Sequence, residues 1–186
     1  MEPIGVLMKE HRLIERMLRI LDTERNEIKA SGKINTNLIQ GSVDFLHNYA
    51  DKNHHGKEED ILFRALDKKK ISFEHRRIVS SLIEDHKTAR TTVNGLDIAQ
   101  KKYVHDGKIL FSEIVHFIDR LLILYPKHIE IEDKHFFYPA MTYFTEEERN
   151  QMLEEFSEFD EHFDHEKYQH MVEEFERGEI EVLRKI

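Results

Sequence analysis

Residues 79–96, VSSLIEDHKTARTTVNGL, contain the pattern that decides the fold. Six positions in this stretch recur with alternating spacings of three and four residues: Val79, Leu82, His86, Ala89, Val93 and Leu96. This alternation is typical of the buried seam of an α-helix, because residues so spaced lie on one face. One position of the seam is a histidine where the pattern favours leucine. The stretch therefore predicts a helix that carries a polar group on its buried face.

Three other segments repeat this arrangement, each with one histidine on its apolar stripe. In two of them a glutamate follows four residues later, still on the inner face. The stripes are Ile4, Leu7, His11, Ile14, Leu18 and Leu21; Ile39, Val43, Leu46, Ala50, His54, Glu58 and Leu62; and Leu110, Ile114, Phe117, Leu121, Leu124, His128 and Glu132.

Interruptions of the helical pattern divide the sequence into five long helical segments, predicted at residues 3–30, 36–69, 72–103, 108–143 and 145–177. The breaks lie at Ser31-Gly32-Lys33, Lys70-Ile71-Ser72, His105-Asp106-Gly107 and Phe144-Thr145. Long helices with short connections favour antiparallel neighbours. We therefore predict an all-α fold, an up-down antiparallel four-helix bundle in residues 1–143. Residues 144–186 are predicted to form an acidic extension with one additional C-terminal helix, packed on the bundle or at a dimer contact.

Composition limits the chemistry of any site. The 186 residues include no cysteine, which excludes thiolate metal sites and iron–sulfur clusters. A metal must then be held by imidazole and carboxylate, which suits iron, manganese, copper or zinc. The net charge of −9 argues against nucleic acid as a partner. No apolar run reaches the ~20 residues of a membrane span, and Met1-Glu2-Pro3-Ile4 does not resemble a signal peptide. We expect a cytoplasmic protein.

A single histidine in an apolar stripe is usually an ordinary core residue. Four of them on four helices, together with Glu58 and Glu132, require another explanation, because an uncompensated buried carboxylate costs several kcal/mol. These groups either form a buried hydrogen-bonded network or share a cation, and we favour the cation. A carboxylate has two oxygens, so each glutamate can bridge two metals, which leaves positions for an oxo or hydroxo bridge, water or a small ligand.

The motifs resemble the hemerythrin-like (HHE cation-binding) family over residues 4–142. The most specific block, residues 54–63, is HHGKEEDILF, and residues 128–133, HIEIED, are similar to its fourth-helix counterpart. The "EH" pairs Glu10-His11 and Asp85-His86 match the first- and third-helix positions. The resemblance implies a carboxylate-bridged di-iron centre. Its implied ligands are His11, His54, Glu58, His86, His128 and Glu132.

The sequence departs from the oxygen carriers of this family. Their third helix has an HxxxH pair, but Leu82 and Arg90 flank His86 here. Their fourth helix has HxxxxD, which would make Asp133 the ligand instead of Glu132. We favour Glu132 because it repeats the spacing of Glu58. One histidine fewer predicts a more open coordination sphere, which argues against simple oxygen carriage.

Other polar residues are expected outside the ligand set. His55 and Glu59 each follow a candidate ligand but point about 100° away from it on an α-helix. We therefore predict that they contact the ligands from outside the centre or lie at the surface. Glu15, one turn after His11, is a further candidate ligand. The remaining histidines are expected to be exposed: His47, His75, His105, His116, His135, His162, His165 and His170.

Three functions fit this pattern. The first is a protein that binds or senses oxygen, nitric oxide or a similar small ligand, with a separate output protein or a second copy of the chain as partner. The second is a redox enzyme or iron donor in peroxide handling, damage response or iron-centre repair. The third, a ferritin-like carboxylate protein, needs Glu-x-x-His pairs on two helices. Glu132 and His135 form one such pair, but Ile61 stands at the matching offset from Glu58.

Overall fold

The computed structural model describes residues 2–106 and 111–179, and these residues are helical throughout, apart from short connections. The all-α prediction is therefore confirmed. The described helices form six rods, where a rod is a single helix or several helical segments that follow one another directly. The four long rods are α1 (Pro3–Ser31), a composite of α2 (Thr36–Phe45), η1 (Leu46–His55), η2 (Glu58–Phe63) and α3 (Arg64–Asp67), then α4 (Phe73–Asp106), and a composite of α5 (Phe111–Ile131), η3 (Glu132–Phe136) and α6 (Phe137–Met141). The two shorter rods are α7 (Glu146–Asp160) and α8 (His165–Arg177).

Local signals explain where these rods begin and end. α1 has Pro3 in its first turn and ends at Gly32, whose φ of 68° is left-handed and whose N–H donates to Ile28. The side chain of Asn35 caps α2 by accepting from the N–H of Leu38 at 3.1 Å. α7 starts with the capping box expected at Thr145 and Glu148. The expected break after Asp106 falls on residues outside the described part of the chain.

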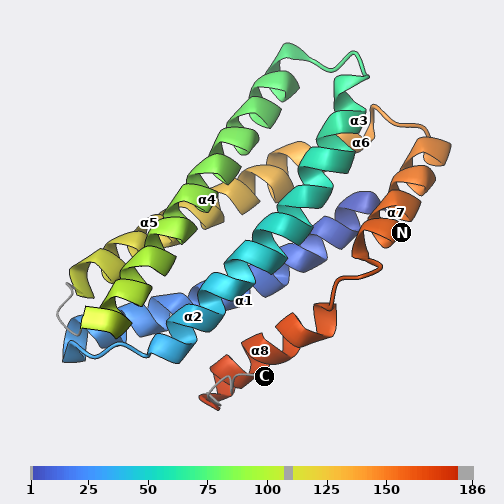
Figure 1. Cartoon of the computed structure of the whole chain (residues 1–186). Coiled ribbons are helices and arrows are strands. Elements are labelled where there is room, and N and C mark those ends of the chain that lie inside the picture. The colour runs from blue at the N-terminus through green and yellow to red at the C-terminus, as the bar shows by residue number, and fades with distance from the viewer. Residues whose placement is uncertain (1, 107–110, 180–186) are drawn as a thin grey trace.

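The four long rods lie side by side and give the molecule an elongated shape (Figure 1). α1 contacts both the 36–67 rod and α5, while α4 packs against α5 and α2. The short 32–35 and 68–72 connections allow this arrangement. Most positions of the predicted stripes are buried between these rods, while Leu110 lies outside the described residues.

The core consists of two apolar clusters with a polar layer between them. One cluster contains Ile14, Met17, Phe45 and Leu121, and the other contains Leu7, Leu62, Leu82, Phe136 and Phe137. Between them each of the four long rods contributes buried polar side chains: His11, His54, Glu58, His86, His128 and Glu132. The polar layer is therefore enclosed by apolar side chains at both ends.

The second rod departs from α-helical geometry where it crosses this layer. η1 and η2 are π-helical, with a wider turn than the α-helix, and η3 repeats this at Glu132. Such segments are rare and are frequent at functional sites. The wider turn agrees with the repeated spacing of four residues from Leu46 to Leu62. It also changes which residues of this rod face inward.

The C-terminal segment forms two helices, not the single helix predicted. The helix is interrupted between α7 and α8, and the side chain of Asp164 caps the start of α8. Both helices lie along the bundle (Figure 1), and Met152 and Phe156 join the second apolar cluster while Met171 joins the first. The domain boundary at residue 144 stays a prediction.

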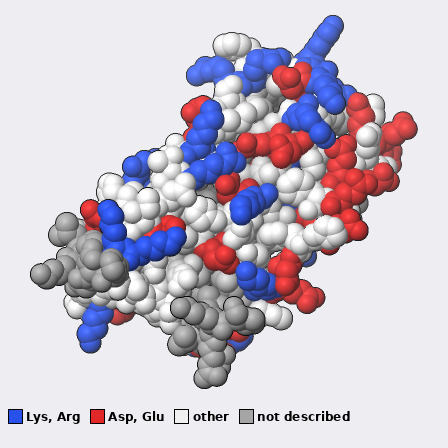
Figure 2. Space-filling model, viewed as in Figure 1, with Lys and Arg blue, Asp and Glu red and all other residues white. Residues whose placement is uncertain are grey.

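The surface is charged and mixed in sign. In the view of Figure 2, Lys and Arg are interspersed with Asp and Glu, and acidic side chains gather over α7. Among the described residues, no helix combines the length and apolar character needed to cross a bilayer.

Candidate metal centre

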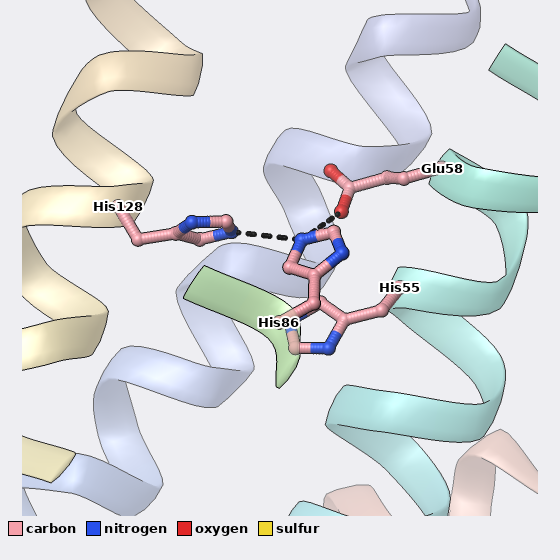
Figure 3. A group of neighbouring side chains, drawn as sticks. All are labelled: His55, Glu58, His86 and His128. Atoms are coloured by element: carbon pink, nitrogen blue, oxygen red, sulfur yellow. Dashed lines mark hydrogen bonds and ion pairs between the residues drawn. The ribbon is translucent and has the colours of Figure 1, made fainter. Parts of the chain in front are cut away.

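The buried histidines and glutamates form two groups that share Glu58. One group consists of His55, Glu58, His86 and His128, and the other of His11, His54, Glu58 and Glu132. Within each group, one ligand atom per residue lies within 4.8 Å of the others. Figure 3 shows the first group, with the imidazoles of His86 and His128 and the carboxylate of Glu58 converging from three rods.

Short distances connect the two groups into one centre. His86 Nε2 lies 3.2 Å from His128 Nε2 and 3.3 Å from Glu58 Oε2. Glu132 Oε2 lies 3.2 Å from both His11 Nε2 and His128 Nε2. Each glutamate thus lies between histidines of both groups, which is the position that a bridging carboxylate needs.

Each of the five histidines is held from outside by a carboxylate at its Nδ1. An ionised carboxylate only accepts hydrogen bonds, so each Nδ1 carries the proton and Nε2 points inward. The pairs are His11 with Asp133 at 2.7 Å, His54 with Glu10 at 2.9 Å, His55 with Asp51 at 3.2 Å, His86 with Glu59 at 2.7 Å and His128 with Asp85 at 3.4 Å. This carboxylate–histidine arrangement orients imidazoles that bind metals.

Several inward atoms lack a hydrogen-bond partner within the described part of the chain. They are Nε2 of His11, His54 and His55 and both carboxylate oxygens of Glu58 and of Glu132. Buried polar atoms are normally paired, because an unpaired one costs about 1–3 kcal/mol. Nitrogen and oxygen donors at one buried point fit a divalent or trivalent cation such as iron, manganese or zinc. The residues present therefore fit a metal centre.

Without a cation, the histidines and glutamates stabilise one another electrostatically. Burial alone lowers the pKa of His11, but the nearby carboxylates of Asp133 and Glu132 outweigh it and raise the pKa to about 10. Burial likewise lowers the pKa of His86, and Glu58 and Glu59 raise it to about 9. Burial raises the pKa of Glu58, but His54 and His86 hold it well below its usual range. Protonated imidazoles can thus supply the positive charge that a metal ion would otherwise bring.

Cations hold several of the outer carboxylates in place. The Arg90 guanidinium donates through Nε to Asp51 and through Nη2 to Glu59, both at 2.7 Å. Arg90 thus organises the carboxylate partners of His55 and His86. Arg12 pairs with Asp133.

His55 was predicted to lie beside the ligands in an outer position or at the surface, and the surface alternative is wrong. Its exposed fraction is 1%, and its ring stacks on His86 with centroids 3.8 Å apart. The surface alternative failed because the π-helical rod is covered on several sides, so that His54 reaches α1 while His55 reaches α4 and α5. His55 belongs to the candidate group with Glu58, His86 and His128, so it is a further candidate ligand. The repeated spacing of four was the signal that could have indicated this.

The other candidates lie outside the two groups. Asp133 binds Nδ1 of His11 and not the inward nitrogen, and Glu15 is partly exposed and pairs with Arg12. Glu59 binds Nδ1 of His86. Eight histidines were expected to be exposed. Four of them are exposed: His116, His135, His162 and His170. His47, His75 and His165 are half-buried, and the side chain of His105 lies outside the described residues.

His55→Ala is expected to weaken iron(II) binding by at least ~10–100-fold, the loss typical of removing even an outer partner of a metal ligand. The reason is that His55 contributes an inward Nε2 to the group with His86 and His128. Anaerobic titration with a competing chelator measures this loss. His135→Ala, which removes an exposed histidine of η3, should bind like the wild type. Equal affinity of the two variants would contradict a role of His55 in binding.

Comparison with known proteins adds one match. The family model of the hemerythrin HHE cation binding domain matches residues 2–103, more than half of the 186 residues. The matched range includes His11, His54, His55, Glu58 and His86, while His128 and Glu132 lie beyond it. No curated protein and no solved structure matches this chain.

Proposed function

Because the chain belongs to the hemerythrin HHE cation-binding family, we propose that it is a non-haem di-iron protein that binds a small ligand such as oxygen or nitric oxide. The four long rods would form the family's up-down antiparallel bundle. The ligand set would comprise His11, His54, His55, Glu58, His86, His128 and Glu132.

The observation that carries this proposal is the shared position of Glu58. Its two oxygens belong to two separate groups of nitrogen and carboxylate ligands, one on each side. Glu58, between His54 and His86, and Glu132, between His11 and His128, would each help to hold two ions. Five histidines and two glutamates also favour a hemerythrin-like centre over a ferritin-like one, where glutamates predominate.

The chain's own residues would set the properties of the centre. Iron supplies the capacity to bind and reduce small diatomic ligands. The outer carboxylates keep each Nδ1 protonated and each Nε2 available, and Phe63 and Phe137 border the centre with apolar surface. Apolar surface of this kind disfavours bulk water and charged molecules at the centre. It therefore favours a small neutral ligand.

Purified protein is expected to contain about two iron atoms per chain, one for each group of ligands. We also expect near-ultraviolet absorption of the kind given by bridged di-iron centres, with a change on adding oxygen or nitric oxide that reverses on removal of the gas. Metal analysis and anaerobic and aerobic spectra measure this. One zinc ion at full occupancy, with no uptake of iron on anaerobic reconstitution, would contradict the di-iron proposal. Sustained turnover of peroxide would favour the redox enzyme instead.

A further inference from the structure

Lys57 is a buried lysine beside the candidate metal centre. It lies between Glu10, which binds the candidate ligand His54, and Asp160 of α7. Its side chain has an exposed fraction of 0%. Its ammonium group pairs with Glu10 and donates to Asp160 Oδ1 at 2.8 Å and to Oδ2 at 3.0 Å. The other oxygen of Glu10 accepts from Nδ1 of His54 at 2.9 Å. An unbroken chain of polar contacts thus runs from His54 to Asp160.

Asp160 is the last residue of α7, and the packing around it is close. Phe159 lies directly over Gly56, where an added Cβ would come within 2.8 Å of the phenyl ring. His165, the first residue of α8, has Nε2 3.2 Å from Asp160 Oδ1. The end of α7 is therefore seated against the junction of η1 and η2, the part of the rod that carries His54, His55 and Glu58.

Charge explains why Asp160 affects His54. A buried ammonium group must be compensated by opposite charge, and Lys57 has two carboxylates for this. If Asp160 lost its charge, Glu10 alone would neutralise Lys57 and would accept less strongly from His54. A weaker bond at Nδ1 lowers the basicity of Nε2 and loosens the orientation of the ring.

We propose that Asp160 is a positioning residue for the metal ligand His54 and acts through Lys57 and Glu10. The C-terminal helices would then tune the group formed by His11, His54, Glu58 and Glu132. In the group of His55, His86 and His128, Arg90 holds the outer carboxylates of His55 and His86, and this group lies outside the chain of contacts from Asp160. The proposal rests on the metal centre proposed above.

The test compares anaerobic iron(II) titrations of the full-length chain, with a competing chelator to resolve the two binding steps. Asp160→Asn should weaken one step by ~10–100-fold, as expected for an outer partner of a ligand, and leave the other unchanged. Asp160→Glu, which keeps the charge, should recover most of the affinity. Glu155→Gln is the matched control, because it removes a carboxylate from the same helix where the side chain forms a surface ion pair with Arg64.

A packing control separates positioning from simple loosening of α7. Phe156→Ala removes a buried side chain of α7 that contributes to the second apolar cluster. It should lower the melting temperature without weakening one iron-binding step more than the other. Selective loss in Asp160→Asn alone supports the inference. Wild-type affinity in Asp160→Asn, or the same pattern in Phe156→Ala, would overturn it. If the wild-type chain itself bound no iron, the proposed function would be overturned instead.

Discussion

Glu58→Ala is expected to abolish binding of both iron ions, because its carboxylate belongs to both groups of ligands. The loss of bound metal should also lower stability. A ligand at about 100 times its Kd contributes about 2.7 kcal/mol to the free energy of unfolding. For a chain of this size that corresponds to a fall in melting temperature of ~5–10 °C. Metal analysis and thermal melts in excess iron(II) measure the two effects.

Two other carboxylates provide the comparison for Glu58→Ala. Glu132→Ala removes an oxygen 3.2 Å from His11 Nε2 and from His128 Nε2, so we expect partial loss of iron. Asp133→Ala removes only the outer partner of His11 and should cost less. Loss of iron in Asp133→Ala together with full occupancy in Glu132→Ala would show that the fourth-helix ligand is Asp133.

Removing the metal is expected to leave a helical but less stable protein. The two apolar clusters, which include Leu7, Met17, Phe45 and Phe136, remain buried without a cation and contribute most of the stability. This contrasts with small zinc domains, which unfold when the ion is removed. Circular dichroism of chelated and reconstituted protein tests the prediction. A random-coil spectrum of the chelated protein at neutral pH would show that the metal drives folding.

The chelated protein should also be sensitive to pH. His11 and His86 have pKa values raised to about 10 and about 9, so their contribution to stability is complete below about pH 6.5 and is lost as the pH rises through those values. Burial lowers the pKa of His55, so its contribution is lost as the pH falls below 6.5. The lowered pKa of Glu58 adds a loss in stronger acid. Melting temperatures of the chelated protein should therefore be highest near pH 6.5 and fall toward pH 10.

Metal-loaded protein serves as the control for this pH dependence. The ion replaces the protons on the inward nitrogens, so the alkaline fall should be much smaller after reconstitution with iron. Equal alkaline loss in both forms would indicate that these imidazoles do not face the bound ion.

Helical periodicity is a local property, and it is why the sequence by itself predicted so much of this protein. The seam from Ile4 to Leu21 is buried at every predicted position, with His11 among its apolar residues. The same holds from Ile39 to Leu62, so the inward positions of His54 and Glu58 followed from spacing alone. The third seam is buried from Leu82 onward, with Val79 half-buried, and the fourth is less regular, with Phe117 and Leu124 half-buried while Ile118 and Tyr125 are buried.

Only the tertiary structure decided which residues meet across helices. His11 finds Asp133, which is 122 positions away, and Lys57 finds Asp160, which is 103 positions away. Such pairs depend on which rods are neighbours and on how far each rod is shifted along the bundle axis. No local sequence pattern encodes either property. His55 shows the same limit, because an α-helical spacing places it outside, whereas a π-helical rod covered by α1, α4 and α7 buries it beside His86. The seams determined that a polar layer exists, and the packing of the rods determined which atoms of that layer converge.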